Sequence, residues 1–362
     1  MAAESSDLSR VHAAVRLLTG DAPTNGGRAA FPVQKFESGV PGSYWPPTLQ
    51  RDLGIGKNMI QKHFLHCTPV DNSALADPKF HFFDLLKKEN VVDTNTYSFF
   101  FLGTYDDTGA DNGEATADKY GIGELKTEVV ASTTQSFTVD FYHTELVADA
   151  LAGGDSAAIK TGYYGILDAR ATAEDGNNFE IIGPLTVTGV IGTEVTFTTA
   201  AAATLSFAAG DRFCTLPTGL ADLLATVNSV DKSGLTGGAS TFDETLVEVY
   251  SSTPRMDLTL TIEAGAATYS AACDVVGWSS GGSMGGGKSI AADVTFANED
   301  PTYPRDIIKI PANTFNGTLT AGDVVILEIY PSMLPIWQRV VIKPGAASGT
   351  AVIKTLDTGE TV

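Results

Sequence analysis

The sequence predicts a mainly β protein: a β-barrel or β-sandwich with one or two short helices, an extended N-terminal arm and an additional β domain. Residues 136–141 and 256–263 show the clearest pattern, because apolar and polar side chains alternate along both segments. A period of two is typical of a strand with one buried face. Other strand-like segments follow at short spacings, with turn residues between them, as in an all-β domain.

Three segments of the middle of the chain continue this pattern. Residues 184–189, 194–199 and 203–213 are rich in Thr, Val and Phe, which strands favour. Near the C-terminus, residues 323–331 form a continuous apolar run, which is typical of a strand that is buried on both faces. We therefore expect strands from about residue 95 to the end of this run.

Helices are expected at few places. Residues 6–20 can form a short helix that begins at Ser6 or Asp7 and ends at Gly20. The segments 77–90 and 218–230 are also expected to be helices.

The first 75 residues differ from the rest of the chain. After the short helix, Gly, Pro and aromatic residues follow one another without a sustained period. Such a segment cannot form a core of its own, so its aromatic side chains need a surface to cover, on this subunit or on a neighbour. These side chains are Phe31, Phe36, Tyr44 and Trp45.

Composition and charge exclude several classes of protein. The chain has 362 residues, of which 43% are hydrophobic, so a disordered chain is not expected. With 23 Lys and Arg against 43 Asp and Glu, the net charge is −20, and this favours solubility and repels DNA. Since we find neither a signal peptide nor an apolar stretch of membrane-spanning length, we expect a cytoplasmically made, soluble chain with no membrane partner. Cys67, Cys214 and Cys273 are widely spaced and are expected to be reduced thiols.

A glycine-rich segment, GGSMGGGKS at 281–289, fits the pattern of a phosphate-binding P-loop from Gly282 to Ser289. A P-loop needs a helix directly after it, so that loop amides and the helix dipole face the phosphates. The residues after Ser289 favour strands and contain prolines, and only 73 residues remain (362 − 289). We therefore interpret the segment as a flexible Gly-Ser loop, at a hairpin tip or between subunits, and not as a nucleotide site.

No other group of residues predicts chemistry. His63, His66 and Cys67 lie close together, with His81 further on, but their spacing matches no zinc pattern. The acidic segment 105–121 does not have the order of a calcium loop and is expected to be solvated. Its acids are Asp106, Asp107, Asp111, Glu114 and Asp118.

The histidines also lack the neighbours of a catalytic site. His12 and His143 complete the set of five, and none lies beside a nucleophile motif. We predict no catalytic, cofactor-binding or metal-binding residue, no cofactor, and a protein that is not an enzyme.

Residues 205–213 resemble residues 317–325, since both contain a Gly-Asp turn between strand-like segments. Shared hairpin chemistry is the simpler explanation, and duplication of a β module is the alternative.

The segment 303–349, YPRDIIKIPANTFNGTLTAGDVVILEIYPSMLPIWQRVVIKPGAASG, resembles virion structural proteins of tailed bacteriophages, most of all tail tube proteins. The resemblance implies a β-barrel or sandwich with a flanking helix and a long arm. It also implies that subunits close into rings, and that stacked rings form a tube through which DNA passes without specific binding. The expected partners are further copies of this chain and other tail proteins, in a virion tail assembled in the cytoplasm of a bacterial host.

The chain is longer than a minimal tube subunit, so the resemblance also implies an additional domain. The expected division is an arm at 1–75, a tube-like core at 76–171 and 239–345, an inserted β domain at 172–238, and a tail at 346–362.

Two other functions stay open from the sequence. A capsid or capsid-decorating protein is one, although we find no long spine helix. A receptor- or carbohydrate-binding β module of a tail fibre is the other, with Trp45, Trp278 and Trp337 as candidates for a sugar-binding face.

Overall fold

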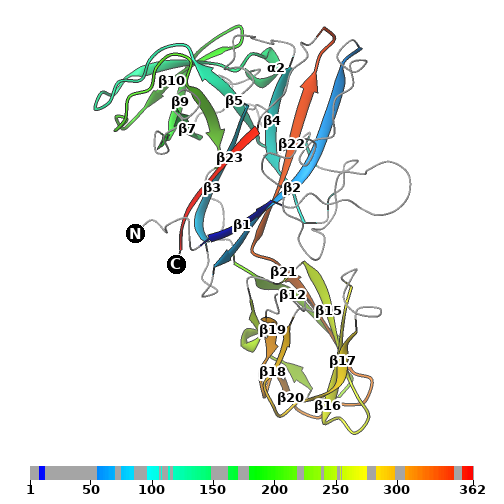
Figure 1. Ribbon diagram of the computed structural model, residues 1–362. Coiled ribbons are helices and arrows are strands. Elements are labelled where there is room, and N and C mark those ends of the chain that lie inside the picture. The colour runs from blue at the N-terminus through cyan, green and yellow to red at the C-terminus, as the bar shows by residue number, and fades with distance from the viewer. Residues whose placement is uncertain are drawn as a thin grey trace.

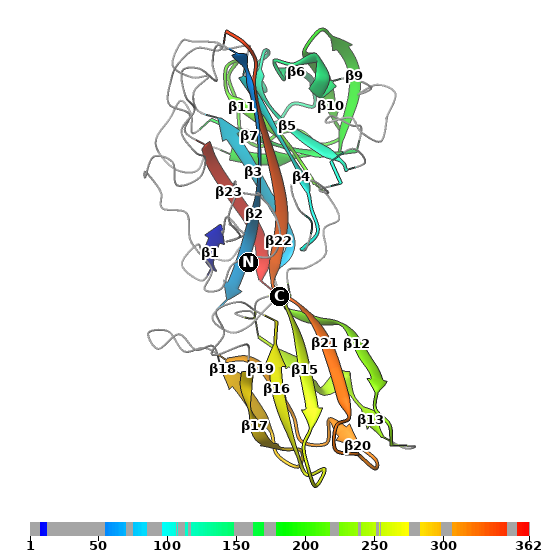
Figure 2. The ribbon, with the colours of Figure 1, turned by 90° about the vertical axis from the view of Figure 1, so that its right-hand side faces the viewer.

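The structure is a computed structural model of the chain. It describes residues 8–12, 55–69, 75–84, 96–105, 107, 113–114, 117–147, 162–169, 179–217, 224–237, 240–250, 253, 255–274, 283–297, 306–345 and 353–361. These residues form two lobes, shown one above the other in Figures 1 and 2.

The first lobe is built on an 11-stranded antiparallel sheet. Its main path runs in the order β1-β2-β22-β4-β5-β11-β7-β8, and β6, β10 and β9 continue from β5 on a second branch. The strands are β1 (Leu8–His12), β2 (Lys57–Pro69), β4 (Thr96–Leu102), β5 (Lys119–Leu125), β6 (Ser136–Asp140), β7 (Tyr164–Asp168), β8 (Phe179–Ile182), β9 (Leu185–Ile191), β10 (Glu194–Thr199), β11 (Arg212–Leu216) and β22 (Met333–Ile342).

From β5, the strands β11 and β7 on one side and β6, β10 and β9 on the other close into a small barrel. Leu185, the first residue of β9, accepts a hydrogen bond from Gly162 N and donates one to Tyr163 O, both at 2.7 Å, next to β7. Apolar side chains on the inner faces of these strands fill the barrel, and several of its Phe rings pack edge to face, which is a favoured geometry. Its aromatic side chains include Phe137, Phe141, Phe197 and Phe213.

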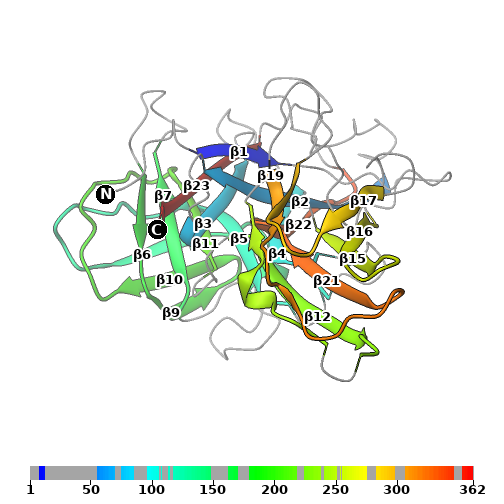
Figure 3. The same ribbon diagram turned by 90° about the horizontal axis from the view of Figure 1, so that it is seen from below.

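The second lobe is a β-sandwich formed by residues 225–330, seen from below in Figure 3. A five-stranded sheet with the order β12-β21-β15-β16-β17 packs against the sheet β14-β19-β18 and the pair β13-β20 around a core of its own. The strands are β12 (Thr226–Gly234), β13 (Thr241–Phe242), β14 (Glu248–Val249), β15 (Met256–Ile262), β16 (Thr268–Cys273), β17 (Ser283–Ser289), β18 (Val294–Ala297), β19 (Asp306–Ile310), β20 (Phe315–Asn316) and β21 (Val324–Tyr330).

The mainly β fold class is confirmed. The alternation predicted in 136–141 and 256–263 lies in β6 and β15, where every second side chain is buried. The described helices are short: α2 (Thr144–Val147) and a 3-10 turn at Glu244–Leu246. No helix within the described ranges is long and apolar enough to cross a membrane.

The three predicted helices are wrong wherever the structure describes them. Residues 8–12 form β1, and residues 75–84 form β3 (Leu75–Asp84), which pairs with β23 (Ile353–Thr361). Residues 226–234 form β12, an edge strand of the five-stranded sheet. Pairing with strands far away in the sequence outweighs the weak local preference of these segments for a helix.

The expected domain boundaries also need correction. Residues 172–238 do not form a separate sheet, because β8 to β11 belong to the first lobe and only β12 belongs to the second. The chain leaves the first lobe after β11 and returns through β22, so the inserted unit is 225–330. The reason is that the apolar faces of β9, β10 and β11 are needed to complete the barrel core.

The expected arm at 1–75 lies mostly outside the described residues, as do the aromatic side chains assigned to it. Within it, β1 and β2 are strands of the first sheet. The expected tail at 346–362 contains β23, which pairs with β3.

Candidate functional site

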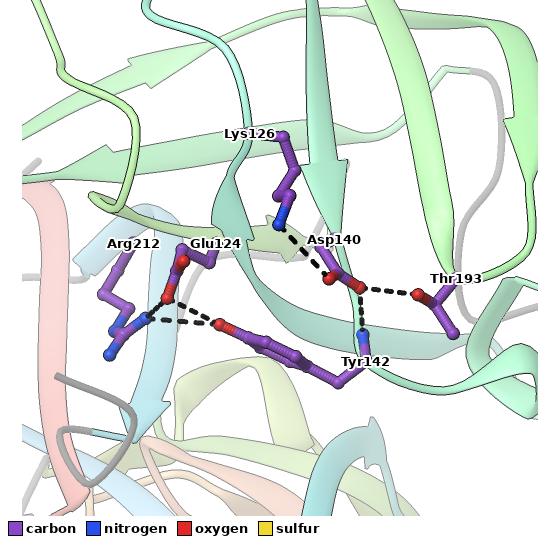
Figure 4. A network of polar contacts seen from close by, with 6 residues as sticks. All are labelled: Glu124, Lys126, Asp140, Tyr142, Thr193 and Arg212. Carbon is purple, nitrogen blue, oxygen red and sulfur yellow. Dashed lines mark hydrogen bonds and ion pairs between the residues drawn. The ribbon is translucent and has the colours of Figure 1, made fainter. Parts of the chain in front are cut away.

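A polar network of the first lobe joins the ends of β5, β6 and β11 (Figure 4). Its central cation is Arg212, the first residue of β11, which is 2% exposed. The Arg212 Nη1 atom lies 2.6 Å from Glu124 Oε2 and 3.4 Å from the Tyr142 hydroxyl oxygen. The Tyr142 hydroxyl in turn donates a 2.7 Å hydrogen bond to Glu124 Oε2. A buried charge needs such partners, since desolvation without them is costly.

Asp140 forms the second half of the network. Its Oδ1 atom accepts hydrogen bonds from Tyr142 N at 2.8 Å and from the Thr193 hydroxyl at 2.7 Å. Its Oδ2 atom lies 3.9 Å from Lys126 Nζ. The Asp140 side chain therefore connects the end of β6 to Tyr142 and to the turn between β9 and β10.

Tyr142 has an unusual backbone conformation. Its φ of +62° lies in the left-handed region, which is uncommon for residues other than glycine. The hydrogen bond from its amide to Asp140 and the bonds of its hydroxyl stabilise this conformation. Burial, together with the hydrogen bond to Glu124, raises the pKa of the Tyr142 hydroxyl, so it remains a neutral donor.

The network fixes the tip of the β9–β10 hairpin. The tip is the two-residue turn Gly192-Thr193, and Thr193 is held twice, by its hydroxyl and by its carbonyl oxygen, which accepts from Phe141 N at 3.0 Å. Next to this turn, Ile191 is 81% exposed. The network therefore presents an apolar side chain on a rigid tip.

The charged groups of this network are paired with one another. Each carboxylate faces a cation, the tyrosine is held neutral, and the network contains no Ser, Cys or His nucleophile or base. His143 follows Tyr142 and is buried, with its Nδ1 atom 3.4 Å from Lys343 Nζ. A group of three or more His, Cys, Asp or Glu residues able to hold a metal does not occur among the described residues.

A second network lies on β2 and β22. The ammonium group of Lys62 forms an ion pair with the Asp107 carboxylate and donates to the backbone oxygens of Tyr105 and Asp107 at 2.9 and 3.2 Å. Trp337 Nε1 donates to Asp107 Oδ2 at 2.9 Å, and the ammonium lies 5.7 Å from the centre of the indole ring. Lys62 is only 1% exposed.

The acidic segment 105–121 is therefore not simply solvated. Asp107 pairs with Lys62, and Glu114 forms an ion pair with Arg339 of β22. Asp106 and Asp111 lie outside the described residues. The prediction of a solvated loop is wrong for Asp107 and Glu114, because two cations of the sheet need partners.

The glycine-rich segment is a strand, so the predicted flexible loop is wrong where it is described. Ser283–Ser289 form β17, which pairs with β16, and the chain then continues into β18. Gly285 and Gly287 have φ values of 94° and 70°, which glycine adopts at little cost. These conformations produce an irregular register but leave the pairing with β16 in place. A strand followed by a strand differs from the strand–loop–helix of a P-loop.

The other singled-out residues are spread over the fold. The backbones of His63, His66 and Cys67 lie in β2, and His81 lies in β3. Cys214 and Cys273 are buried thiols in different sheets. Trp45 and Trp278 lie outside the described residues. Trp337 is fully buried and cannot contribute to a sugar-binding face.

Arg212, Tyr142 and Lys62 were not predicted from the sequence. The available signal was a cation next to apolar residues in a strand-like segment, Arg212 at the start of Arg212–Leu216 and Lys62 within Asn58–Leu65. A cation in such a place needs a buried acid, but the sequence does not indicate which one.

The fold and the two networks define a two-lobed, all-β protein whose buried polar groups tie strands and loops together. Comparison of the chain with protein families, with curated proteins and with solved structures found no match in any of the three.

Proposed function

We propose that this chain is a structural virion protein that assembles with copies of itself into stacked rings, forming a phage tail tube with an acidic lumen. The proposal rests on the resemblance of residues 303–349 to tail tube proteins and on the mainly β fold. The observation that carries it is the rigid β9–β10 tip, which exposes Ile191 beside a turn fixed by hydrogen bonds.

A fixed apolar tip is suited to a permanent contact between copies. Single exposed apolar residues are common on protein surfaces. Ile191 differs because Thr193, in the adjacent turn, is bonded to Asp140 and Phe141, so little conformational freedom remains to be lost on binding. In the assembly, Ile191 of one copy inserts into an apolar site on the neighbouring copy.

The charge supports the role of the assembled ring. DNA carries about one negative charge per 1.7 Å, and a basic wall would bind it strongly. A chain with a net charge of −20 repels DNA and lets it pass.

Negative-stain electron microscopy of the purified protein tests the proposal. Rings or hollow tubes are expected, as is antibody label along the tail of virions. Label confined to capsids or fibre tips, with no rings from the purified protein, would contradict it.

The variant Ile191→Glu tests the contact. A carboxylate at the tip cannot enter an apolar site, so fewer assemblies are expected, with unchanged circular dichroism. Leu246→Glu is the matched control, since Leu246 is also an exposed apolar residue but lies in the second lobe. Wild-type tubes with equal assembly of Ile191→Glu would refute the contact without refuting the function.

A further inference from the structure

The two lobes meet where β21 ends and β22 begins. Only Pro331 and Ser332 separate these strands, and both residues are buried. Rotation of one lobe against the other therefore requires backbone rotation at this short connection, together with the loss of any contact that spans it.

The loop after β4 is anchored in the first lobe. Gly103 N donates to Pro335 O at 3.1 Å, and Thr104 N donates to Asp107 Oδ2 at 2.9 Å. The same Asp107 carboxylate binds Lys62 and Trp337. Residues 103–105 and 107 thus have a fixed base on β2 and β22.

Tyr105, in the middle of this loop, contacts the other lobe. Its ring centre lies 4.5 Å from that of Tyr330, the last residue of β21, with the planes tilted by 47°. Its hydroxyl donates to Pro331 O at 3.2 Å. One side chain therefore touches both the second lobe and the connection.

Tyr330 is itself held in place within the second lobe. The guanidinium carbon of Arg255 lies 5.3 Å from its ring centre. Arg255 is fixed by Asp257 at 2.6 Å and by Glu328 at 2.8 Å. The ring that Tyr105 contacts is thus itself held by contacts within the second lobe.

We propose that Tyr105 is a latch that sets the orientation of the second lobe relative to the first. A latch is defined here as a side chain of one lobe whose contacts with the other must break before the lobes can rotate. The contacts include a ring pair and a hydrogen bond, each of which is weak enough to open and close reversibly. This inference does not depend on the proposed assembly into tubes.

Small-angle X-ray scattering and hydrogen exchange of the full chain, measured on the monomeric fraction, test the latch. Tyr105→Ala is expected to broaden the distance distribution. It should also speed amide exchange in peptides covering residues 328–336 by about two- to tenfold, as expected from the loss of one aromatic pair. Tyr105→Phe keeps the ring and loses only the hydroxyl, so an intermediate effect is expected.

Tyr164→Ala serves as the matched control. Tyr164 is a half-buried tyrosine of β7 that packs near Gly183 within the first lobe, so its loss should leave the scattering profile unchanged. If Tyr105→Ala does not fold, Tyr330→Leu removes the same ring pair from the other side. A folded Tyr105→Ala or Tyr330→Leu variant with wild-type scattering and wild-type exchange at the connection would overturn the proposal.

Discussion

Asp211 and Asp323 occupy equivalent positions in two turns of the same construction, one in each lobe. In each turn the Oδ2 atom accepts from the amide three residues earlier, at 2.8 Å from Ala208 and at 2.9 Å from Thr320. The backbone of each turn also bonds to the end of a neighbouring strand, at Leu125 and at Ile262.

The preceding glycines have nearly the same conformation, with φ values of 97° at Gly210 and 92° at Gly322. The similarity predicted between 205–213 and 317–325 therefore reflects a shared turn, in which glycine supplies the positive φ and aspartate caps the amide.

The first prediction concerns Asp323, which is 1% exposed. Its Oδ1 atom also accepts from the amide and hydroxyl of Thr236 at 2.9 and 2.5 Å. Asp323→Asn is expected to destabilise the protein by about 1–3 kcal/mol in urea unfolding at pH 7, because hydrogen bonds to a buried carboxylate are lost or weakened. Asp231→Ala is the control, since that carboxylate is exposed and is bonded by Ser233, and a smaller loss is expected.

The hydrogen bonds of Asp323 also predict that its contribution to stability depends on pH. Hydrogen bonds from Thr236, and from the amide of Thr320, lower the pKa of Asp323 below its usual value. A carboxyl whose pKa is lowered in the folded state stabilises the protein above its unfolded pKa and loses this effect as the pH falls. The difference between the wild type and Asp323→Asn should therefore be full at pH 7 and shrink below about pH 4. A constant difference would show that the charge of Asp323 does not contribute.

The second prediction concerns Gly103. A Cβ atom at this position would lie 2.6 Å from Trp337 Cδ1 and 2.7 Å from Asp107 Oδ2. Gly103→Ala should therefore lower the unfolding free energy by about 1–3 kcal/mol, as overpacking commonly does. In the control Gly189→Ala the nearest atoms, those of Thr196, are 3.7 Å away, and a neutral or slightly stabilising effect is expected. Equal stability of the two variants would contradict the packing around Trp337.

The third prediction concerns the Lys62–Asp107 ion pair. Lys62→Met leaves the Asp107 carboxylate without its cation, and a loss of about 3–5 kcal/mol is typical when one partner of a buried pair is removed. The double variant Lys62→Met/Asp107→Asn should lose less than the sum of the two single variants, as measured by a double-mutant cycle. Lys309→Met, which removes a more exposed pair with Glu248, should cost less than about 1 kcal/mol. Additive effects at Lys62 and Asp107 would refute the coupling.

The fourth prediction concerns alkaline pH. Burial raises the pKa of Tyr105 to about 12 and also raises that of Tyr120, Tyr163 and Tyr269. Because the unfolded chain ionises near pH 10, the contribution of the neutral phenols is full below this pH and is lost as the pH rises further. For Tyr105 the loss lies between about pH 10 and 12. Urea unfolding at pH 9, 10.5 and 11.5 measures this loss of unfolding free energy, and tyrosinate absorbance follows the ionisation. The unfolding free energy of Tyr105→Phe should decline less steeply with pH than that of the wild type. A decline as steep as that of the wild type would mean that Tyr105 does not contribute.

The sequence by itself determined the fold class and several strands. Leu258, Leu260 and Ile262 alternate with polar residues, and this period allows one buried face only in a strand, so β15 could be predicted without knowledge of its partners. The Gly-Asp turns could also be recognised, because a positive φ and an amide cap depend on neighbouring residues alone. The net charge of −20 likewise needs no structure.

The tertiary structure alone decided the contacts between distant segments. β3 is a strand because it pairs with β23, which lies near the other end of the chain. Lys62, Asp107 and Trp337 come from β2, from the loop after β4 and from β22, so no spacing in the sequence predicts that they meet. The physical reason is that burial stabilises a residue through whichever neighbours the fold provides, and a β-sheet takes most of these neighbours from elsewhere in the chain.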